Sequence, residues 1–214
     1  MFLLQIAGTG YNNIPIELAR SKNIDVCNIP TYSNESVAHM VITYIMNFGA
    51  AIFDQARMLN QNNHQNFKVF QHPIYEITGK TLGMIGGSGT IGTAVADVAL
   101  PLGMSIVISS RQERLPPGHK YEHHEKVKVV PFDEVFRQSD FVSINCPLNS
   151  NTRHSVGKRE IRLMKPTAFL INTARGAIIN ESELVECMRE RVIAGAGLGV
   201  KIQYILEFIF ARLL

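Results

Sequence analysis

The sequence contains no tryptophan and only three cysteines among its 214 residues. Cys27, Cys146 and Cys187 form no CxxC pair. An odd number of scattered thiols argues against a disulfide framework and against a cysteine-based metal site. We therefore expect three buried, reduced thiols in a cytoplasmic protein.

Long apolar runs and strong charge excess are also missing. No run reaches the ~18 apolar residues that a membrane-spanning helix needs, and the apolar start at Met1 lacks the basic region of a signal peptide. The 21 basic and 18 acidic residues nearly balance, and the basic ones are not interleaved with aromatic residues. These absences predict a globular protein with neither nucleic acid nor membrane as a partner.

Short apolar runs alternate with helical patterns from residue 81 onward, which is typical of a doubly wound parallel α/β sheet. We predict strands at 82–85, 104–109, 127–130, 141–145, 168–172 and 193–198. We predict helices at 90–100, 133–138, 158–164 and 181–189. The carboxyl ends of parallel strands meet at one edge of such a sheet, so ligands are expected there.

The first 72 residues follow another pattern. Strands are predicted at 2–7 and 26–29, with a short helix at 14–21 between them. Ser33 precedes one long helix, because apolar residues recur at three- and four-residue steps as far as Leu59. The polar, asparagine-rich residues 61–71 are expected to end that helix.

The stretch TLGMIGGSGTIGTAVADVA, residues 81–99, is predicted to form a strand, a glycine turn and a helix. It matches GxGxxG, in which the first glycine makes a tight turn, the second admits a pyrophosphate and the third lets helix and strand pack closely. The helix start adds unpaired N–H groups and a positive dipole end. The predicted pyrophosphate-binding residues are Gly87, Gly89, Thr90, Ile91 and Gly92. Two alternatives stay open: a register that begins at Gly86, and a purely structural glycine turn.

The end of the next strand selects the cofactor. An acidic residue there would bind the ribose hydroxyl of NAD, but this sequence has Ser109, Ser110 and Arg111. Two hydroxyls and a guanidinium suit a 2′-phosphate, so we favour NADP over NAD. Glu113 is a displaced alternative acid, and a solvated Arg111 is the competing interpretation.

One arginine stands where a buried strand runs into a turn, in INTARGAII at residues 171–179. Arg175 would project from a strand end at the binding edge of the sheet. Its planar fork can hold a carboxylate or a carbonyl oxygen there. A plain surface charge is the alternative.

Six segments, in their order and spacing, resemble the D-isomer-specific 2-hydroxyacid dehydrogenases: GTGYNNI, PTYSNESVAH, TGKTLGMIGGSGTIG, SDFVSINCPLNSNTRHSVGKREIRLMKP, INTARGAIINE and IAGAGL. The resemblance covers residues 3–198. It implies a Rossmann-type cofactor lobe at 73–200. Residues 1–72 would be part of a flavodoxin-like substrate lobe with an interdomain helix, and 201–214 an atypical tail.

The resemblance also implies roles for individual residues. The turn at Thr9 and Gly10 would face the substrate carboxylate, and Arg175 would be the catalytic arginine. The adenosine side would be lined by Asn145, Cys146 and Pro147, and the nicotinamide side by Thr173, Ala174 and Arg175. The implied reaction is hydride transfer between the nicotinamide of NAD or NADP and a small 2-oxo or 2-hydroxy acid. Relatives dimerise through the cofactor lobe, so a homodimer is expected.

The sequence departs from the family after residue 198. Gly199 stands where the family has an aspartate that binds the nicotinamide amide, and residues 201–205 lack the glutamate that orients a catalytic histidine. The histidine itself, and the first part of the substrate lobe, have no counterpart. The cluster of His119, His123 and His124 is expected to be a solvated loop rather than a metal site.

Two consequences are expected from this departure. Turnover would be at least a hundredfold below that of a complete relative, with a non-catalytic cofactor-binding fragment or an NAD(P)-sensing protein as alternatives. Helix residues Val41, Ile45 and Phe48 would also lose their packing partners and be exposed, unless a helical tail at 205–214 covers them.

Overall fold

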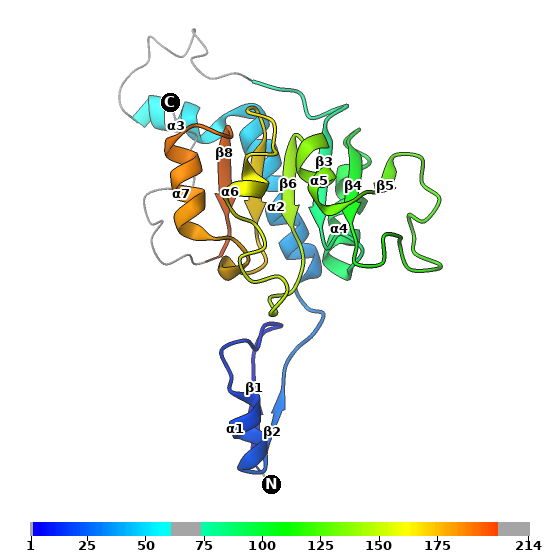
Figure 1. The fold of residues 1–214 in the computed structure, drawn as a ribbon, viewed down its shortest axis with the longest axis vertical. Coiled ribbons are helices and arrows are strands. Elements are labelled where there is room, and N and C mark those ends of the chain that lie inside the picture. The colour runs from blue at the N-terminus through cyan, green and yellow to red at the C-terminus, as the bar shows by residue number, and fades with distance from the viewer. Residues whose placement is uncertain (1, 61–73, 201–214) are drawn as a thin grey trace.

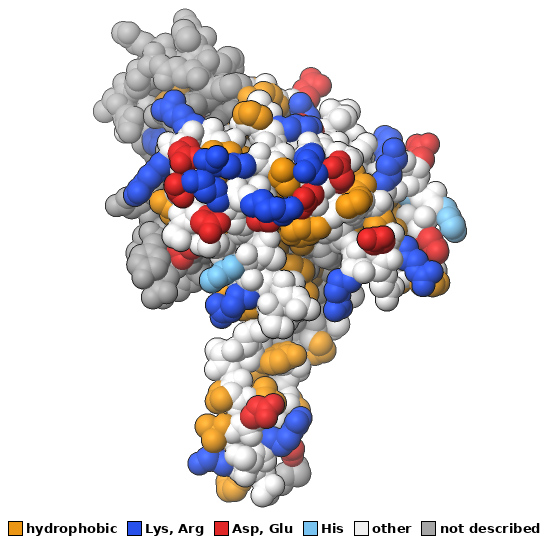
Figure 2. All heavy atoms as spheres, in the orientation of Figure 1, with side chains coloured by type: hydrophobic (Ala, Val, Ile, Leu, Met, Phe, Trp, Pro, Cys, Tyr) orange, Lys and Arg blue, Asp and Glu red, His pale blue; other side chains and the backbone are white. Residues whose placement is uncertain are grey.

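The computed structural model describes residues 2–60 and 74–200, which form a small unit and a larger lobe (Figure 1). In the small unit, strands β1 (Phe2–Gln5) and β2 (Ile24–Cys27) pair in parallel, with helix α1 (Ile16–Ser21) between them in the chain. The predicted strand–helix–strand order is confirmed. The unit projects from the larger lobe (Figure 2), and every residue of β1 is exposed.

The long helix predicted from Ser33 to Leu59 is wrong in one respect, because it is two helices. Helix α2 (Asn34–Ala50) and helix α3 (Ile52–Asn60) meet at an angle of 64°. Ala51 lies between them in the left-handed region, with a φ of 53°. A single left-handed residue is enough to end a right-handed helix.

Two other hydrogen bonds replace the one that would continue the helix. The N–H of Phe53 would reach back to the carbonyl of Gly49 in a continuous helix. Instead it donates to Oδ1 of Asn47 at 3.0 Å, and the Gly49 carbonyl accepts the N–H of Tyr75 at 2.9 Å. The apolar spacing continues across the break, so the sequence pattern gave no sign of it.

The larger lobe is built on a six-stranded parallel sheet with the order β5-β4-β3-β6-β7-β8. Its strands are β3 (Thr81–Ile85), β4 (Ser105–Ser109), β5 (Val127–Val129), β6 (Phe141–Ile144), β7 (Phe169–Asn172) and β8 (Gly195–Leu198). Its helices are α4 (Thr90–Ala99), α5 (Phe132–Gln138), α6 (Lys158–Ile161) and α7 (Glu181–Arg189), with a short 3-10 helix at Gly176–Ile178. The predicted doubly wound parallel sheet is confirmed, with strand ends shifted by one or two residues.

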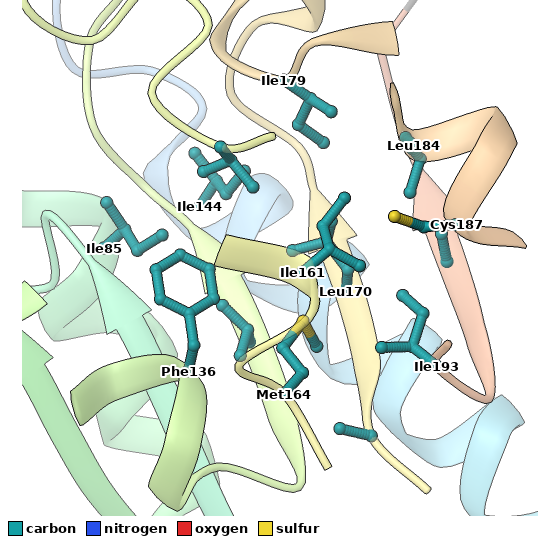
Figure 3. Close-up of a cluster of buried hydrophobic side chains, with 14 of the residues drawn as sticks. Ile85, Phe136, Ile144, Ile161, Met164, Leu170, Ile179, Leu184, Cys187 and Ile193 are labelled. Carbon is teal, nitrogen blue, oxygen red and sulfur yellow. The ribbon is translucent and has the colours of Figure 1, made fainter. Parts of the chain in front are cut away.

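Helices cover both faces of this sheet. Helices α5, α6 and α7 pack on one face, where Phe136, Ile161 and Leu184 meet Ile144 and Leu170 of the central strands (Figure 3). Helices α2 and α4 pack on the other face. Because β6 and β7 are buried on both sides, they are nearly continuous apolar runs rather than alternating ones, interrupted by Ser143 and Asn172. Each fully buried side chain of this size stabilises the fold by roughly 1.5–3 kcal/mol.

The expectation that Val41, Ile45 and Phe48 are exposed is wrong. Their exposed fractions are 0, 0 and 2%, because α2 lies against α4 and the sheet. The ring of Phe48 stacks on Phe169 of β7 with 4.3 Å between centroids. The packing partner of α2 is therefore the larger lobe itself, which this chain contains.

The cysteine prediction is also wrong for one residue. Cys146 and Cys187 are buried, but Cys27 lies at the exposed end of β2, where the small unit is only two strands wide. In the described residues no single helix is long and apolar enough to cross a membrane. The bent pair α2 and α3 passes that test together, on length and composition only.

Arg191 has a backbone conformation that favours glycine over other residues. Arg191 lies two residues after the end of helix α7 and has a φ of 56°, and the N–H groups of Arg191 and Val192 donate to the carbonyls of Met188 and Cys187. This is a Schellman motif with arginine where glycine is favoured. We expect Arg191→Gly to be about 1 kcal/mol more stable than Arg191→Ala, since both lose the same charge and only glycine adopts this φ without strain. Urea denaturation checks this, and equal stabilities would contradict it.

Candidate functional site

The strand order places a topological switch point between the carboxyl ends of β3 and β6. From β3 the chain winds outward through β4 and β5, then returns to β6 and winds the other way to β8. Ligands of doubly wound sheets bind at such a switch point. Two loops meet there, because a Cβ added to Gly86 would lie 2.9 Å from the backbone nitrogen of Cys146.

The glycines of the turn after β3 differ in what surrounds them. Gly86 has a φ of 78° and makes the reversal. A Cβ on Gly87 would lie 2.7 Å from Cβ of Met84, and one on Gly92 would lie 2.5 Å from Cα of Gly87. This packing is that of the GxGxxG register that begins at Gly87, with Gly86 as an additional turn residue.

The first turn of α4 presents unpaired N–H groups. Gly89 precedes the helix without a side-chain cap, and a Cβ there would meet nothing closer than the Gly86 carbonyl at 3.7 Å. Within the described part of the chain, the N–H groups of Thr90, Ile91 and Gly92 donate to no protein acceptor. Open space before free donors at a helix start fits the pyrophosphate of a dinucleotide.

The end of β4 carries the residues predicted to select the cofactor. Ser109 and Ser110 are half-buried, and Arg111 is exposed. A turn follows, closed by the N–H of Glu113 donating to the Ser110 carbonyl at 3.0 Å. The guanidinium of Arg111 has neither ion pair nor hydrogen bond with any described residue.

The ends of β6 and β7 hold buried polar atoms that have no partner among the described residues. Directly after the strands they are the side-chain amide of Asn145 and the hydroxyl of Thr173, and within β6 the hydroxyl of Ser143 is also without a partner. Buried polar atoms are nearly always hydrogen-bonded in proteins, so orphaned ones beside the switch point indicate a water or ligand partner. Cys146 lies beside them, and burial raises the pKa of its thiol. Pro147 follows and is exposed.

A residue that the sequence reasoning missed shapes the β7 turn. Asn172 is fully buried, accepts the N–H of Ala174 at 3.0 Å and donates to the carbonyl of Arg175 at 2.9 Å. It was visible as the one polar residue in the buried strand FLIN. Gly199, at the end of β8, donates its N–H to the Asn172 carbonyl at 2.9 Å.

The structure brings Arg175 to the N-terminal turn. A Cβ on Gly10 would lie 2.8 Å from Cζ of Arg175. The neighbouring Thr9 is held by its hydroxyl, which donates to Ile29, and by its carbonyl, which accepts the Asn28 amide. The two predicted parts of the substrate site therefore lie side by side.

The Arg175 side chain also meets a residue that the sequence reasoning missed. Its Nε donates to Oδ1 of Asn12 at 3.0 Å, and its Nη1 donates to the Ala174 carbonyl at 2.7 Å. Asn12 lies in the quoted segment GTGYNNI, but no local pattern separated it from Asn13.

A glycine turn at the switch point of a doubly wound parallel sheet, with free donors at the following helix, defines a Rossmann-type dinucleotide-binding protein. Residues 42–204 match the NAD binding domain of the D-isomer specific 2-hydroxyacid dehydrogenases. The chain belongs to this family.

Individual relatives agree with the family. The chain is 36% identical over 197 residues to a glyoxylate reductase of Thermococcus litoralis, covering 89% of this chain and 57% of the relative. A D-lactate dehydrogenase of Aquifex aeolicus, solved with NAD and lactic acid, superposes with a TM-score of 0.82 at 28% identity, covering 95% of this chain and 59% of that one. The chain thus spans less than two thirds of the length of these relatives.

Similar structures contain either cofactor. An acyclic imino acid reductase in complex with NADPH and D-Arg has a TM-score of 0.77 at 28% identity, covering 96% of this chain and 64% of that one. These structures support a nicotinamide dinucleotide as the cofactor. They include both NAD and NADPH complexes, so the preference between the two must be argued from residues of this chain.

Proposed function

We propose that the protein binds a nicotinamide dinucleotide at the switch point. The complete protein would act in hydride transfer between the nicotinamide and a small 2-oxo or 2-hydroxy acid. The observation that carries the proposal is the juxtaposition of two features at one sheet edge. The free N–H groups of Thr90 to Gly92 lie at the end of β3, and Arg175 at the end of β7 lies against the Gly10 turn.

Different residues of the chain would bind the cofactor and the acid. A bound nicotinamide would supply or accept the hydride. The N–H groups at the start of α4 would hold the pyrophosphate, and the residues after β6 and β7 would line the adenosine and nicotinamide sides. Arg175 would bind the carboxylate of the acid and polarise its 2-oxo group, because a guanidinium fork matches planar oxygen pairs. Thr9 and Gly10 would close the site opposite Arg175.

No proton donor is included in this proposal. Protonation of the developing alkoxide needs a group with a pKa near neutrality, usually a histidine oriented by a carboxylate. No histidine of the described residues forms a hydrogen bond or ion pair with a carboxylate. The described residues thus support binding and polarisation, and nucleotide binding without turnover would favour the NAD(P)-binding alternative.

The proposal is tested on the purified chain. NADH and NADPH binding is measured by nucleotide fluorescence, and glyoxylate and pyruvate reduction by absorbance at the nicotinamide band. Saturable binding of at least one nucleotide is expected. Binding of neither would contradict the proposal for the cofactor lobe.

We further propose NADP as the preferred cofactor, on the strength of the unpaired Arg111 and the absence of an acidic residue at the end of β4. Arg111→Asp is expected to weaken NADPH binding about ten- to hundredfold and NADH binding far less, since one charge-assisted hydrogen bond to the 2′-phosphate is lost. Lys128→Asp, the same charge change at an exposed site on β5, serves as the control. Equal losses for both nucleotides would overturn the preference.

A cytoplasmic homodimer also belongs to the proposal. Support comes from the three free cysteines and from apolar side chains on the outer faces of α2 and α3. The exposed large apolar residues there are Met40, Met46, Ile52, Phe53 and Leu59. Side chains of this kind suit a symmetric contact between two copies.

A further inference from the structure

We propose that Asn12 is a positioning residue for Arg175. From the small N-terminal unit it would hold the guanidinium in place, and because an amide is neutral, it would leave the positive charge free for an anionic substrate. The inference rests on the proposed function, because it assigns a partner to the group that would bind the acid. Asn12 would act through Arg175.

Asn12 bridges the two parts of the molecule. Its Oδ1 accepts from Nε of Arg175 at 3.0 Å, across 163 residues of sequence, and its Nδ2 donates to the Leu148 carbonyl at 3.5 Å. Among the described residues, these are the two hydrogen bonds that join residues 2–33 to residues 74–200. One side chain therefore contacts the loops after both β6 and β7.

The partners of Arg175 are neutral. Nε donates to the Asn12 amide and Nη1 to the Ala174 carbonyl, while Nη2 lies beside Gly10. None of the described acidic side chains forms an ion pair with it. A guanidinium has five N–H donors. Neutral acceptors can therefore fix its plane while its positive charge and its remaining N–H groups stay free to bind an anion.

A carboxylate at position 12 would do something different. It would hold Arg175 more strongly and at the same time neutralise it, because charge-assisted pairs are roughly twice as strong as neutral ones. An amide therefore suits a group that must be both fixed and positively charged. A variant with aspartate at position 12 should then hold Arg175 more strongly and bind an anion more weakly. A contact that served stability alone would not produce this combination.

Three variants of the full chain test this: Asn12→Ala, Asn12→Asp and the control Asn13→Ala. Asn13 is the exposed neighbour and its side chain forms no hydrogen bond with a described residue. Oxalate, a small dicarboxylate, is the probe for the anion site, and its Kd is measured in the presence of saturating nucleotide.

We expect Asn12→Ala to weaken oxalate binding about tenfold, as the loss of one hydrogen bond predicts, with nucleotide binding changed less than about twofold. Asn12→Asp should weaken oxalate at least as much while leaving thermal stability unchanged or higher. Asn13→Ala should match the parent protein. Restoration of oxalate binding by Asn12→Asp, or parallel losses of stability and binding in both Asn12 variants, would overturn the inference.

A double-mutant cycle separates this inference from the proposed function. Stabilities of the parent, Asn12→Ala, Arg175→Ala and the double variant are measured in urea without any ligand. A coupling between the two residues supports the contact, and additive effects overturn it. Failure of the parent protein to bind nucleotide or oxalate, with the coupling present, would instead overturn the proposed function.

Discussion

Gly92→Ala is expected to abolish nucleotide binding and to lower stability. The added methyl would stand 2.5 Å from backbone atoms of Gly87, which cannot move aside as the end of a flexible side chain could. Helix α4 must then shift away from β3, at a cost of roughly 1–3 kcal/mol for overpacking. The N–H groups of Thr90, Ile91 and Gly92 would move with it. Losing two charge-assisted hydrogen bonds to the pyrophosphate weakens binding by about a hundredfold or more.

Gly89→Ala is the matched control for this effect. A Cβ at position 89 meets no atom closer than 3.7 Å, so stability should stay within about 0.5 kcal/mol of the parent value. The methyl would project into the space assigned to the pyrophosphate, and nucleotide binding should fall without unfolding. Urea denaturation and fluorescence titration measure the two quantities. Normal nucleotide binding by Gly92→Ala would contradict the assignment of this turn.

Arg175→Ala is expected to remove binding of 2-oxo acids while leaving the nucleotide largely bound. A bidentate guanidinium–carboxylate pair has two charge-assisted hydrogen bonds, so its loss should weaken oxalate binding by about 10²–10⁴-fold. The turn itself should persist, because Asn172 holds it through the backbone of Ala174 and Arg175. Titration with oxalate in the presence of saturating nucleotide gives the Kd of oxalate. Titration with nucleotide alone gives the Kd of the nucleotide.

Two further variants decide what the arginine contributes. Arg175→Lys keeps the charge without the planar fork and should recover only a minor part of the binding. Arg189→Ala removes an exposed arginine from the last turn of α7 and should leave both ligands unaffected. If Arg175→Ala bound oxalate as the parent does, the carboxylate site would have to lie elsewhere.

The sheet was predictable because its signals are local. Most strands from β3 to β8 are short, mainly apolar runs bounded by glycine or polar residues, and burial on both faces makes the runs of the central strands β6 and β7 nearly continuous. The glycine turn was predictable for a related reason. Gly92 must pack on Gly87, and that requirement shows in the spacing of the glycines.

The interruption of α2 was not predictable in this way. The apolar spacing continues past Ala51, and Ala51 itself is a good helix former. What ends the helix is the Asn47 side chain together with Tyr75, which arrives from a distant part of the chain. The burial of Phe48 was missed for a similar reason, since a helical stripe does not reveal which surface covers it.

The sequence by itself determined the parallel sheet, the glycine turn at Gly87 to Gly92 and an arginine at the end of a strand. These follow from short-range backbone preferences and from the periodicity of burial, which neighbouring residues determine together. Only the tertiary structure decided that Arg175 meets Gly10 and Asn12. Such a contact spans more than 160 residues and depends on how the small unit and the sheet pack, which no local pattern records.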